Sequence, residues 1–152
     1  MRKALFLDRD GVINVDKNYV CTISDFEFTK GIFELCRNYQ DEGYLIFVVT
    51  NQAGIARKIF SEDNFLELTG WMLKQFNEKG IEIAKVYYCP HHPDFTGTCN
   101  CRKPKPGLFL RAAKDFDIDM SESVLIGDKE SDIRAGVNAG IKTCLYIQEL
   151  QF

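Results

Sequence analysis

Short apolar runs alternate along this chain with longer segments of helical periodicity. The apolar runs are residues 4–7, 44–49, 124–126 and 143–147, with a weaker fifth run at 84–88. Between them, hydrophobic side chains recur at steps of three and four residues in segments 31–42, 61–79, 109–116 and 133–139. Strands that alternate with helices are typical of β-α-β units. The chain therefore predicts an α/β fold built on a parallel sheet.

The composition is that of one globular domain spanning residues 1–152, with 45% hydrophobic and 27% charged residues. The net charge of −3, with both signs mixed along the chain, argues against nucleic acid or an anionic membrane as a partner. No apolar stretch approaches the roughly 18 residues of a membrane-spanning helix. The apolar run after Arg2 and Lys3 ends at Asp8, so we expect no signal peptide. We expect a cytoplasmic monomer that acts on a small molecule.

Polar residues follow three of the predicted strands directly. Asp8 and Asp10 follow the first run, Thr50 follows the second, and Asp128 follows the run at 124–126. The carboxyl ends of parallel strands meet at one edge of the sheet, where open α/β proteins bind their ligands. The sequence therefore predicts a single site that gathers these side chains. Three unrelated acidic loops are the alternative.

Three acids in a small volume require a cation, and oxygen ligands without a histidine favour Mg²⁺. Thr50 adds a hydroxyl, the loop 51–54 adds backbone N–H groups, and Lys103 and Lys105 offer ammonium groups. Such a set of donors suits a tetrahedral phosphate dianion. We interpret Asp8 as the nucleophile that forms an aspartyl-phosphate. Asp10, two residues further on, would protonate the leaving oxygen and then deprotonate the attacking water.

Cysteine is concentrated in one window with a histidine. The four residues of this cluster are Cys89, His91, Cys99 and Cys101. Three sulfurs and one imidazole are a common composition of structural zinc sites, although the one-residue gaps are tighter than usual. Four protein ligands leave no open position, so the zinc would hold the loop 89–101. Ordinary loop cysteines, or a redox pair of two of them, are the alternatives, and we do not expect His92 to be a ligand.

These motifs, in this order, resemble the four signatures of the haloacid dehalogenase superfamily of phosphatases. The matching residues are Asp8-x-Asp10-Gly11-Val12, Thr50-Asn51, Lys103 and Gly127-Asp128-Lys129-x-x-Asp132. The resemblance implies a Rossmann-like sheet with helices on both faces, here with no large cap domain. It implies that Thr50 and Lys103 stabilise the phosphoryl group. Mg²⁺ would be held by Asp8, Asp128 and the backbone carbonyl of Asp10, with Asp132 as a supporting acid.

Within the superfamily, the chain resembles the D-glycero-D-manno-heptose 1,7-bisphosphate 7-phosphatases, which serve the synthesis of activated heptose for surface glycans. The resemblance rests on residues 89–93 and 99–107, in and after the cysteine loop 89–101, and on stretches 14–20 and 50–57. It implies that a phosphorylated sugar is bound by Asp16, Lys17, Asn18, Tyr19, Thr50, Asn51, Gln52, Ala53, Arg102, Lys103 and Lys129. Arg102 would hold the second, non-reacting phosphate, because a guanidinium suits bidentate phosphate binding.

Two other functions remain open on the sequence. Histidinol-phosphate phosphatases share the zinc loop but differ in the residues after Gln52. Receiver domains of signalling proteins also place acids, a threonine and a lysine at strand ends, but their acid pair is adjacent. Heptose bisphosphate phosphatases usually continue with a further strand and helix, so the resemblance does not predict how that edge of the sheet is covered.

Overall fold

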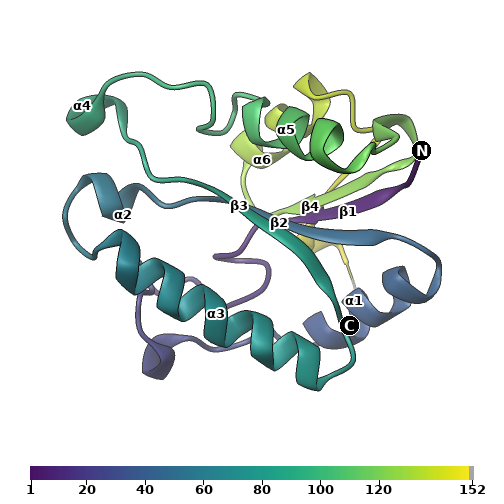
Figure 1. The fold of residues 1–152 in the computed structure, drawn as a ribbon, viewed down its shortest axis with the longest axis horizontal. Coiled ribbons are helices and arrows are strands. Elements are labelled where there is room, and N and C mark those ends of the chain that lie inside the picture. Colours follow the sequence, from purple (N-terminus) through teal and green to yellow (C-terminus); the bar gives the residue numbers. More distant parts are fainter. Residues whose placement is uncertain (151–152) are drawn as a thin grey trace.

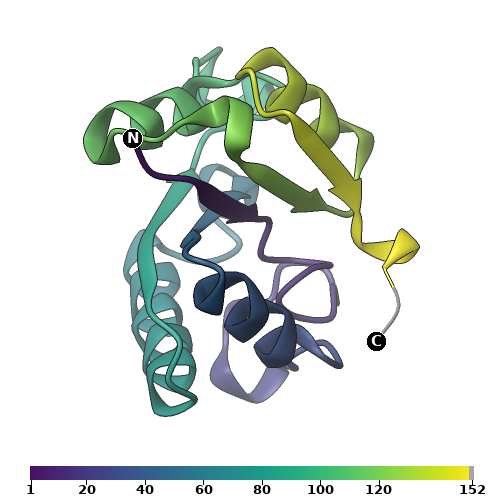
Figure 2. The same cartoon turned by 90° about the vertical axis from the view of Figure 1, so that its right-hand side faces the viewer.

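The computed structural model describes residues 1–150, which form a parallel sheet between two layers of helices (Figures 1 and 2). Within these residues the sheet has five strands in the order β3-β2-β1-β4-β5. The strands are β1 (Ala4–Leu7), β2 (Leu45–Asn51), β3 (Ile83–Cys89), β4 (Val124–Gly127) and β5 (Thr143–Tyr146). All four residues of the central strand β1 are fully buried, as expected for a strand covered on both faces.

Helices α1 and α3 cover one face of the sheet, and α5 and α6 cover the other (Figures 1 and 2). The helices are α1 (Ile32–Asp41), α2 (Ala53–Ala56), α3 (Glu62–Glu78), α4 (Pro93–Thr96), α5 (Gly107–Phe116) and α6 (Glu130–Asn138). Three 3-10 turns lie at Ile23–Asp25, Met120–Glu122 and Ile147–Glu149. Ser61 begins α3, because its hydroxyl accepts a hydrogen bond from the Asn64 N–H and the Asn64 side chain accepts one from the Ser61 N–H.

Alternate residues of the central strands supply two hydrophobic cores. Leu5 and Leu7 of β1 pack toward α1 and α3, whereas Ala4 and Phe6 pack toward α5 and α6. The Phe6 ring stacks on Phe47 of β2, with ring centroids 5.4 Å apart. This two-sided burial fixes the sheet, so that side chains just beyond the strand ends are held on a rigid base.

The predicted fold class is confirmed, with differences in detail. β2 begins one residue later and ends two residues later than predicted, at Asn51, and the last apolar run divides into β5 and a 3-10 turn. The short helices α2 and α4 have too few residues to show a helical period and were not predicted. Between the end of β1 and the start of α1, the described residues form a loop with one 3-10 turn and no further domain. No cap domain inserted there covers this edge of the sheet.

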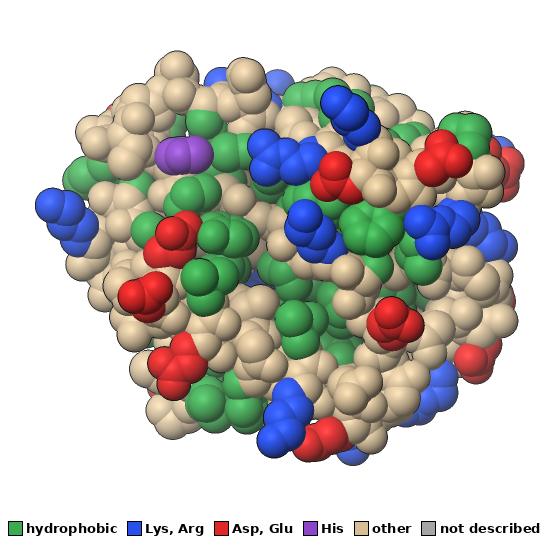
Figure 3. Space-filling view, in the orientation of Figure 1, with side chains coloured by type: hydrophobic (Ala, Val, Ile, Leu, Met, Phe, Trp, Pro, Cys, Tyr) green, Lys and Arg blue, Asp and Glu red, His purple; other side chains and the backbone are tan. Residues whose placement is uncertain are grey.

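The surface carries both charges interspersed, and hydrophobic side chains gather near the middle of the face shown in Figure 3. In the same orientation β3 forms the front edge of the sheet (Figure 1). None of the helices within residues 1–150 has the length and apolar character needed to cross a membrane.

Candidate active site

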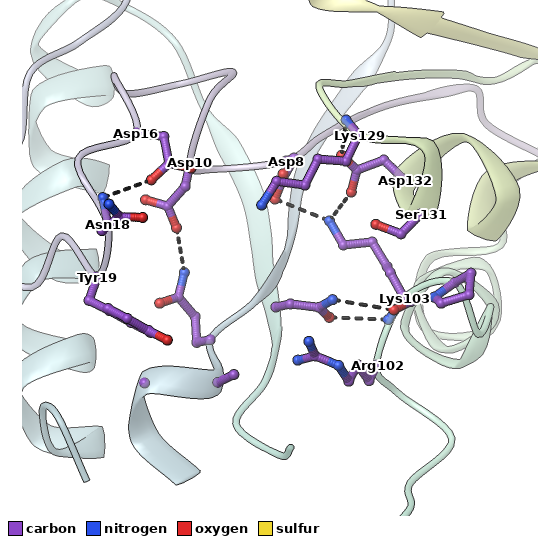
Figure 4. A pocket seen from close by; sticks show the side chains of 15 residues that line it. Asp8, Asp10, Asp16, Asn18, Tyr19, Arg102, Lys103, Lys129, Ser131 and Asp132 are labelled. Atoms are coloured by element: carbon purple, nitrogen blue, oxygen red, sulfur yellow. Dashed lines mark hydrogen bonds and ion pairs between the residues drawn. The ribbon is translucent and has the colours of Figure 1, made fainter. Parts of the chain in front are cut away.

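A cavity of about 520 Å³ opens at the carboxyl ends of β1, β2 and β4 (Figure 4). This is the sheet edge that the sequence predicted. The cavity is lined by Asp8, Asp10, Asp16, Asn18, Tyr19, Asn51, Gln52, Ala53, Gly54, Arg102, Lys103, Pro104, Lys129, Ser131 and Asp132. Most of the side chains predicted to act or to bind therefore meet in one place.

Asp8, Lys103 and Asp132 form a buried ionic group at the base of the cavity. The Lys103 ammonium lies 3.1 Å from Asp8 Oδ1 and 2.5 Å from Asp132 Oδ1. Burial raises the pKa of the Asp8 carboxyl to about 8, because the Lys103 ammonium only partly offsets desolvation and the neighbouring acids. Burial lowers the pKa of Lys103, but the two carboxylates outweigh it and the net shift is upward. This lysine therefore stays charged beside the predicted nucleophile.

Lys103 is held in place by the end of β2. Its ammonium also donates to the Val49 carbonyl at 2.9 Å. Its backbone N–H donates to Asn51 Oδ1 at 3.1 Å, and the Asn51 amide donates back to the Lys103 carbonyl at 3.4 Å. The Asn51 side chain thus clamps Lys103, and Asn51 also lines the cavity, where its predicted contact with substrate stays a prediction.

Asp128 approaches the first loop so closely that only glycine fits there. Gly11 has φ of +91°, and a Cβ at this position would lie 2.1 Å from Asp128 Oδ2. Asp128 Oδ1 is buried and finds no hydrogen-bond donor within residues 1–150. One oxygen each of Asp8, Asp128 and Asp132 lies within 4.8 Å of the others. Both Asp132 oxygens are already used, because Lys103 pairs with Oδ1 and the backbone N–H groups of Asp128 and Lys129 donate to Oδ2. These residues therefore fit a divalent cation bound mainly by Asp8 and Asp128.

Gln52 connects the second strand to the first loop. Its Nε2 donates to Asp10 Oδ2 at 3.1 Å and to Thr50 Oγ1 at 2.9 Å. Both amide hydrogens are therefore used inside the protein, and only the side-chain oxygen remains for a ligand. Thr50 is fully buried just behind the cavity wall.

The predicted zinc ligands form a compact cluster beside the cavity. Cys89 Sγ lies 2.9 Å from Cys101 Sγ and 3.6 Å from Cys99 Sγ, and His91 Nδ1 lies 3.2 Å from Cys101 Sγ. Ligands of a tetrahedral zinc at Zn–S of about 2.3 Å are separated by about 3.7 Å. Burial raises the pKa of the Cys99 thiol, but backbone N–H donors from Arg102 and Cys101 bring it to about 6. The Cys89–Cys99 separation matches the ligand spacing of about 3.7 Å and the Cys89–Cys101 separation is shorter, while the four side chains together offer the donor set of a four-coordinate zinc.

The loop after the first strand forms the opposite wall. Asn18 and Tyr19 have φ of 60° and 54°, a conformation that side chains rarely adopt. The Asp16 carboxylate supports this turn by accepting from the Asn18 N–H at 3.0 Å. Tyr19 and Arg102 extend into the cavity from opposite sides (Figure 4).

Two of the lysines considered in the sequence analysis do not reach the cavity. The Lys17 ammonium pairs with Glu27 at 3.2 Å, and Lys17 is not one of the residues that line the cavity. Lys105 is exposed and donates to the Cys99 carbonyl, so it supports the cysteine loop instead of contributing to the cavity.

Three residues at or beside the cavity were not predicted from the sequence: Arg9, Asn14 and Ser131. Only the position of Arg9 between two acids could have drawn attention to it.

A family model and two relatives of similar sequence indicate which group of proteins this chain resembles. The HAD-hydrolase-like family model matches residues 100–149. D-glycero-alpha-D-manno-heptose-1,7-bisphosphate 7-phosphatase of Campylobacter jejuni is 53% identical over 147 residues, covering 97% of this chain and 83% of that protein. D-glycero-beta-D-manno-heptose-1,7-bisphosphate 7-phosphatase of Vibrio cholerae is 48% identical over 152 residues, covering 97% and 82%.

A solved structure agrees with this similarity. D,D-heptose 1,7-bisphosphate phosphatase from B. bronchiseptica, in complex with magnesium and phosphate, superposes with a TM-score of 0.84 and 28% identity. The match covers 95% of this chain and 78% of that one. The fold and the sequence thus point to the same group of enzymes.

Proposed function

The chain belongs to the haloacid-dehalogenase-like phosphatases, in the family of the heptose-bisphosphate 7-phosphatases, and we propose that it removes the 7-phosphate of D-glycero-D-manno-heptose 1,7-bisphosphate. The observation that supports this substrate is the presence of two cationic residues, Lys103 and Arg102, at different ends of one cavity. Asp8 and Lys103 lie at the base, and the Arg102 guanidinium extends into the cavity from the cysteine loop (Figure 4). A substrate with two phosphates uses both ends.

In this proposal Asp8 attacks phosphorus while the bond from phosphorus to the sugar 7-oxygen breaks. The proton on Asp10 passes to that oxygen, so the heptose leaves as a neutral alcohol. Lys103 faces the charge that develops on the transferring group and is already fixed by the Asn51 clamp. Asp10 then takes a proton from water, which attacks the aspartyl-phosphate and releases inorganic phosphate.

Two metals complete the proposed enzyme. A Mg²⁺ ion held by Asp8 and Asp128 would neutralise the charge of these carboxylates and of the phosphate, a role that fits the unpartnered Asp128 oxygen. A structural Zn²⁺ in the cysteine cluster would hold the loop that presents Arg102 and Lys103. The monomeric state and the cytoplasmic location stay predictions.

We infer further that the α anomer is the preferred substrate. Two relatives named for the α anomer are 53% and 51% identical to this chain, and a relative named for the β anomer is 48% identical. Both anomers carry the 7-phosphate that the base of the cavity would hydrolyse, so the difference would concern the position of the 1-phosphate near Arg102.

The test compares kcat/KM for three substrates: the α and β anomers of the heptose bisphosphate and histidinol phosphate. The proposal predicts that the α anomer is hydrolysed best and histidinol phosphate worst. Faster hydrolysis of histidinol phosphate than of either anomer would contradict the proposed substrate. Faster hydrolysis of the β anomer than of the α anomer would contradict only the anomer.

A further inference from the structure

Arg9, the residue between the two acids of the first motif, is buried behind the cavity. Its side chain is 2% exposed and does not line the cavity wall. It therefore cannot contact a substrate phosphate, although an arginine in a phosphatase motif suggests that role. Burying a guanidinium is unfavourable unless a charged partner and hydrogen bonds compensate it.

The charged partner of Arg9 is Asp10. The Arg9 Nη2 lies 2.9 Å from Asp10 Oδ1 and 3.2 Å from Oδ2, and Nε lies 3.3 Å from Oδ1. This is the only ion pair that Arg9 forms with residues 1–150. The same Nη2 also donates to the Val20 carbonyl at 2.8 Å.

Aromatic rings hold the guanidinium in this position. Its central carbon lies 5.9 Å from the Phe26 ring centroid and 5.8 Å from that of Phe65 on α3. The planar group thus lies against two aromatic rings, and its hydrogen bonds to Asp10 and to the Val20 carbonyl keep it facing Asp10. The orientation of the Asp10 carboxylate is fixed from behind by a rigid charged group.

Asn14 supplies a second donor to the same oxygen. Its Nδ2 lies 3.0 Å from Asp10 Oδ1 and 3.2 Å from the Val15 carbonyl. Asn14 is fully buried, and its own Oδ1 has no hydrogen-bond partner among the described residues. An unsatisfied amide oxygen destabilises a fold, so the donation to Asp10 offers a reason for an asparagine here.

The two oxygens of Asp10 are therefore unequal. Oδ1 accepts N–H groups from Arg9 and Asn14, which fill both of its lone pairs. Oδ2 accepts an unshared hydrogen bond only from Gln52, because one Nη2 hydrogen of Arg9 goes to the Val20 carbonyl and the other is shared with the closer Oδ1. We propose that Arg9 is a positioning residue, supported by Asn14, that turns Asp10 so that Oδ2 carries the proton delivered to the leaving oxygen.

This inference rests on the proposed phosphatase mechanism, and it predicts a dependence on the leaving group. A sugar alkoxide needs the proton from Asp10 as the bond to phosphorus breaks, whereas p-nitrophenolate leaves without one. Arg9→Met should lower the single-turnover rate of phosphoryl transfer from an alkyl phosphate by about 10- to 100-fold. The same variant should lower the rate from p-nitrophenyl phosphate by less than about threefold.

Three further variants separate positioning from folding. Phe109→Leu loosens the core on the opposite face of the sheet, away from Arg9 and Asp10, and it should change both rates by the same factor. Arg9→Lys keeps the charge and should restore part of the alkyl phosphate rate. Asn14→Leu should show a smaller selective loss of the same kind, and it carries the test if Arg9→Met does not fold.

A double-mutant cycle completes the experiment. In an Asp10→Asn background, Arg9→Met should lower the alkyl phosphate rate no further, because the group that it positions is gone. Equal losses on both substrates in the Arg9 and Asn14 variants, or fully additive losses in the cycle, would overturn the proposal. If the wild-type enzyme does not hydrolyse heptose bisphosphate, the proposed substrate fails, and the same comparison is made with whichever alkyl phosphate it does hydrolyse.

Discussion

The base of the cavity and its rim are held in different ways. At the base, the side chains of Lys103 and Asp132 are 3% exposed and that of Asp8 is 10% exposed. Strand ends and mutual ion pairs fix all three. At the rim, Tyr19 is 44% exposed, and Arg102 is carried by a loop with little core of its own. The comparison indicates that the sheet determines the chemistry, whereas loops determine the substrate.

The largest effect is expected at the base, for Asp8→Asn. An amide cannot act as the nucleophile, so phosphate release should fall by about 10⁴-fold or more on every phosphomonoester. The thermal unfolding midpoint should change little, because Lys103 keeps its contact with Asp132. A variant that retains turnover would show that another group attacks phosphorus.

Lys103→Met should affect both activity and stability. Removing the ammonium leaves two buried carboxylates unpaired, so we expect a loss of about 3–5 kcal/mol in the free energy of unfolding, measured with denaturant. Turnover should fall by about 10²- to 10³-fold, as for the loss of a donor to the transition state. Lys105→Met is the matched control, because Lys105 is exposed and lies outside the cavity. Equal effects of the two variants would contradict the special role of Lys103.

Loss of the cysteine-cluster metal should affect the rim more than the base. The purified protein should contain about one zinc per chain, and Cys101→Ser should remove it. We expect KM for heptose bisphosphate to rise by about 10- to 100-fold, while kcat for p-nitrophenyl phosphate falls by less than about threefold. The base should persist because Asn51 and Val49 hold Lys103 independently. Normally folded wild-type protein without zinc would refute the metal site.

Arg102→Met should give the smallest effect, because only one contact of the rim is lost. Removing one charged hydrogen-bonding group should lower kcat/KM for the bisphosphate by about tenfold. Heptose 7-phosphate, which lacks the 1-phosphate, should be hydrolysed equally by the variant and the wild-type enzyme. An equal loss on both substrates would place Arg102 near the reacting phosphate instead.

The sequence predicted the base better than the rim, for a physical reason. Asp8 and Asp128 follow buried strands, so the periodicity that predicts the strands also brings the two acids together. The directions of loop side chains depend on tertiary contacts, which the hydrophobic periodicity of the sequence does not reveal. Lys17 turns to Glu27, and Arg9 is buried although arginine is usually exposed.

The most direct test of the central claim is to locate the phosphoryl group during turnover. Wild-type enzyme is mixed with the α anomer of heptose 1,7-bisphosphate, quenched in acid within one turnover, and digested for mass spectrometry. The account predicts a phosphoryl group on Asp8, with heptose 1-phosphate as the released sugar. A phosphoryl group on another residue, or release of heptose 7-phosphate, would contradict it.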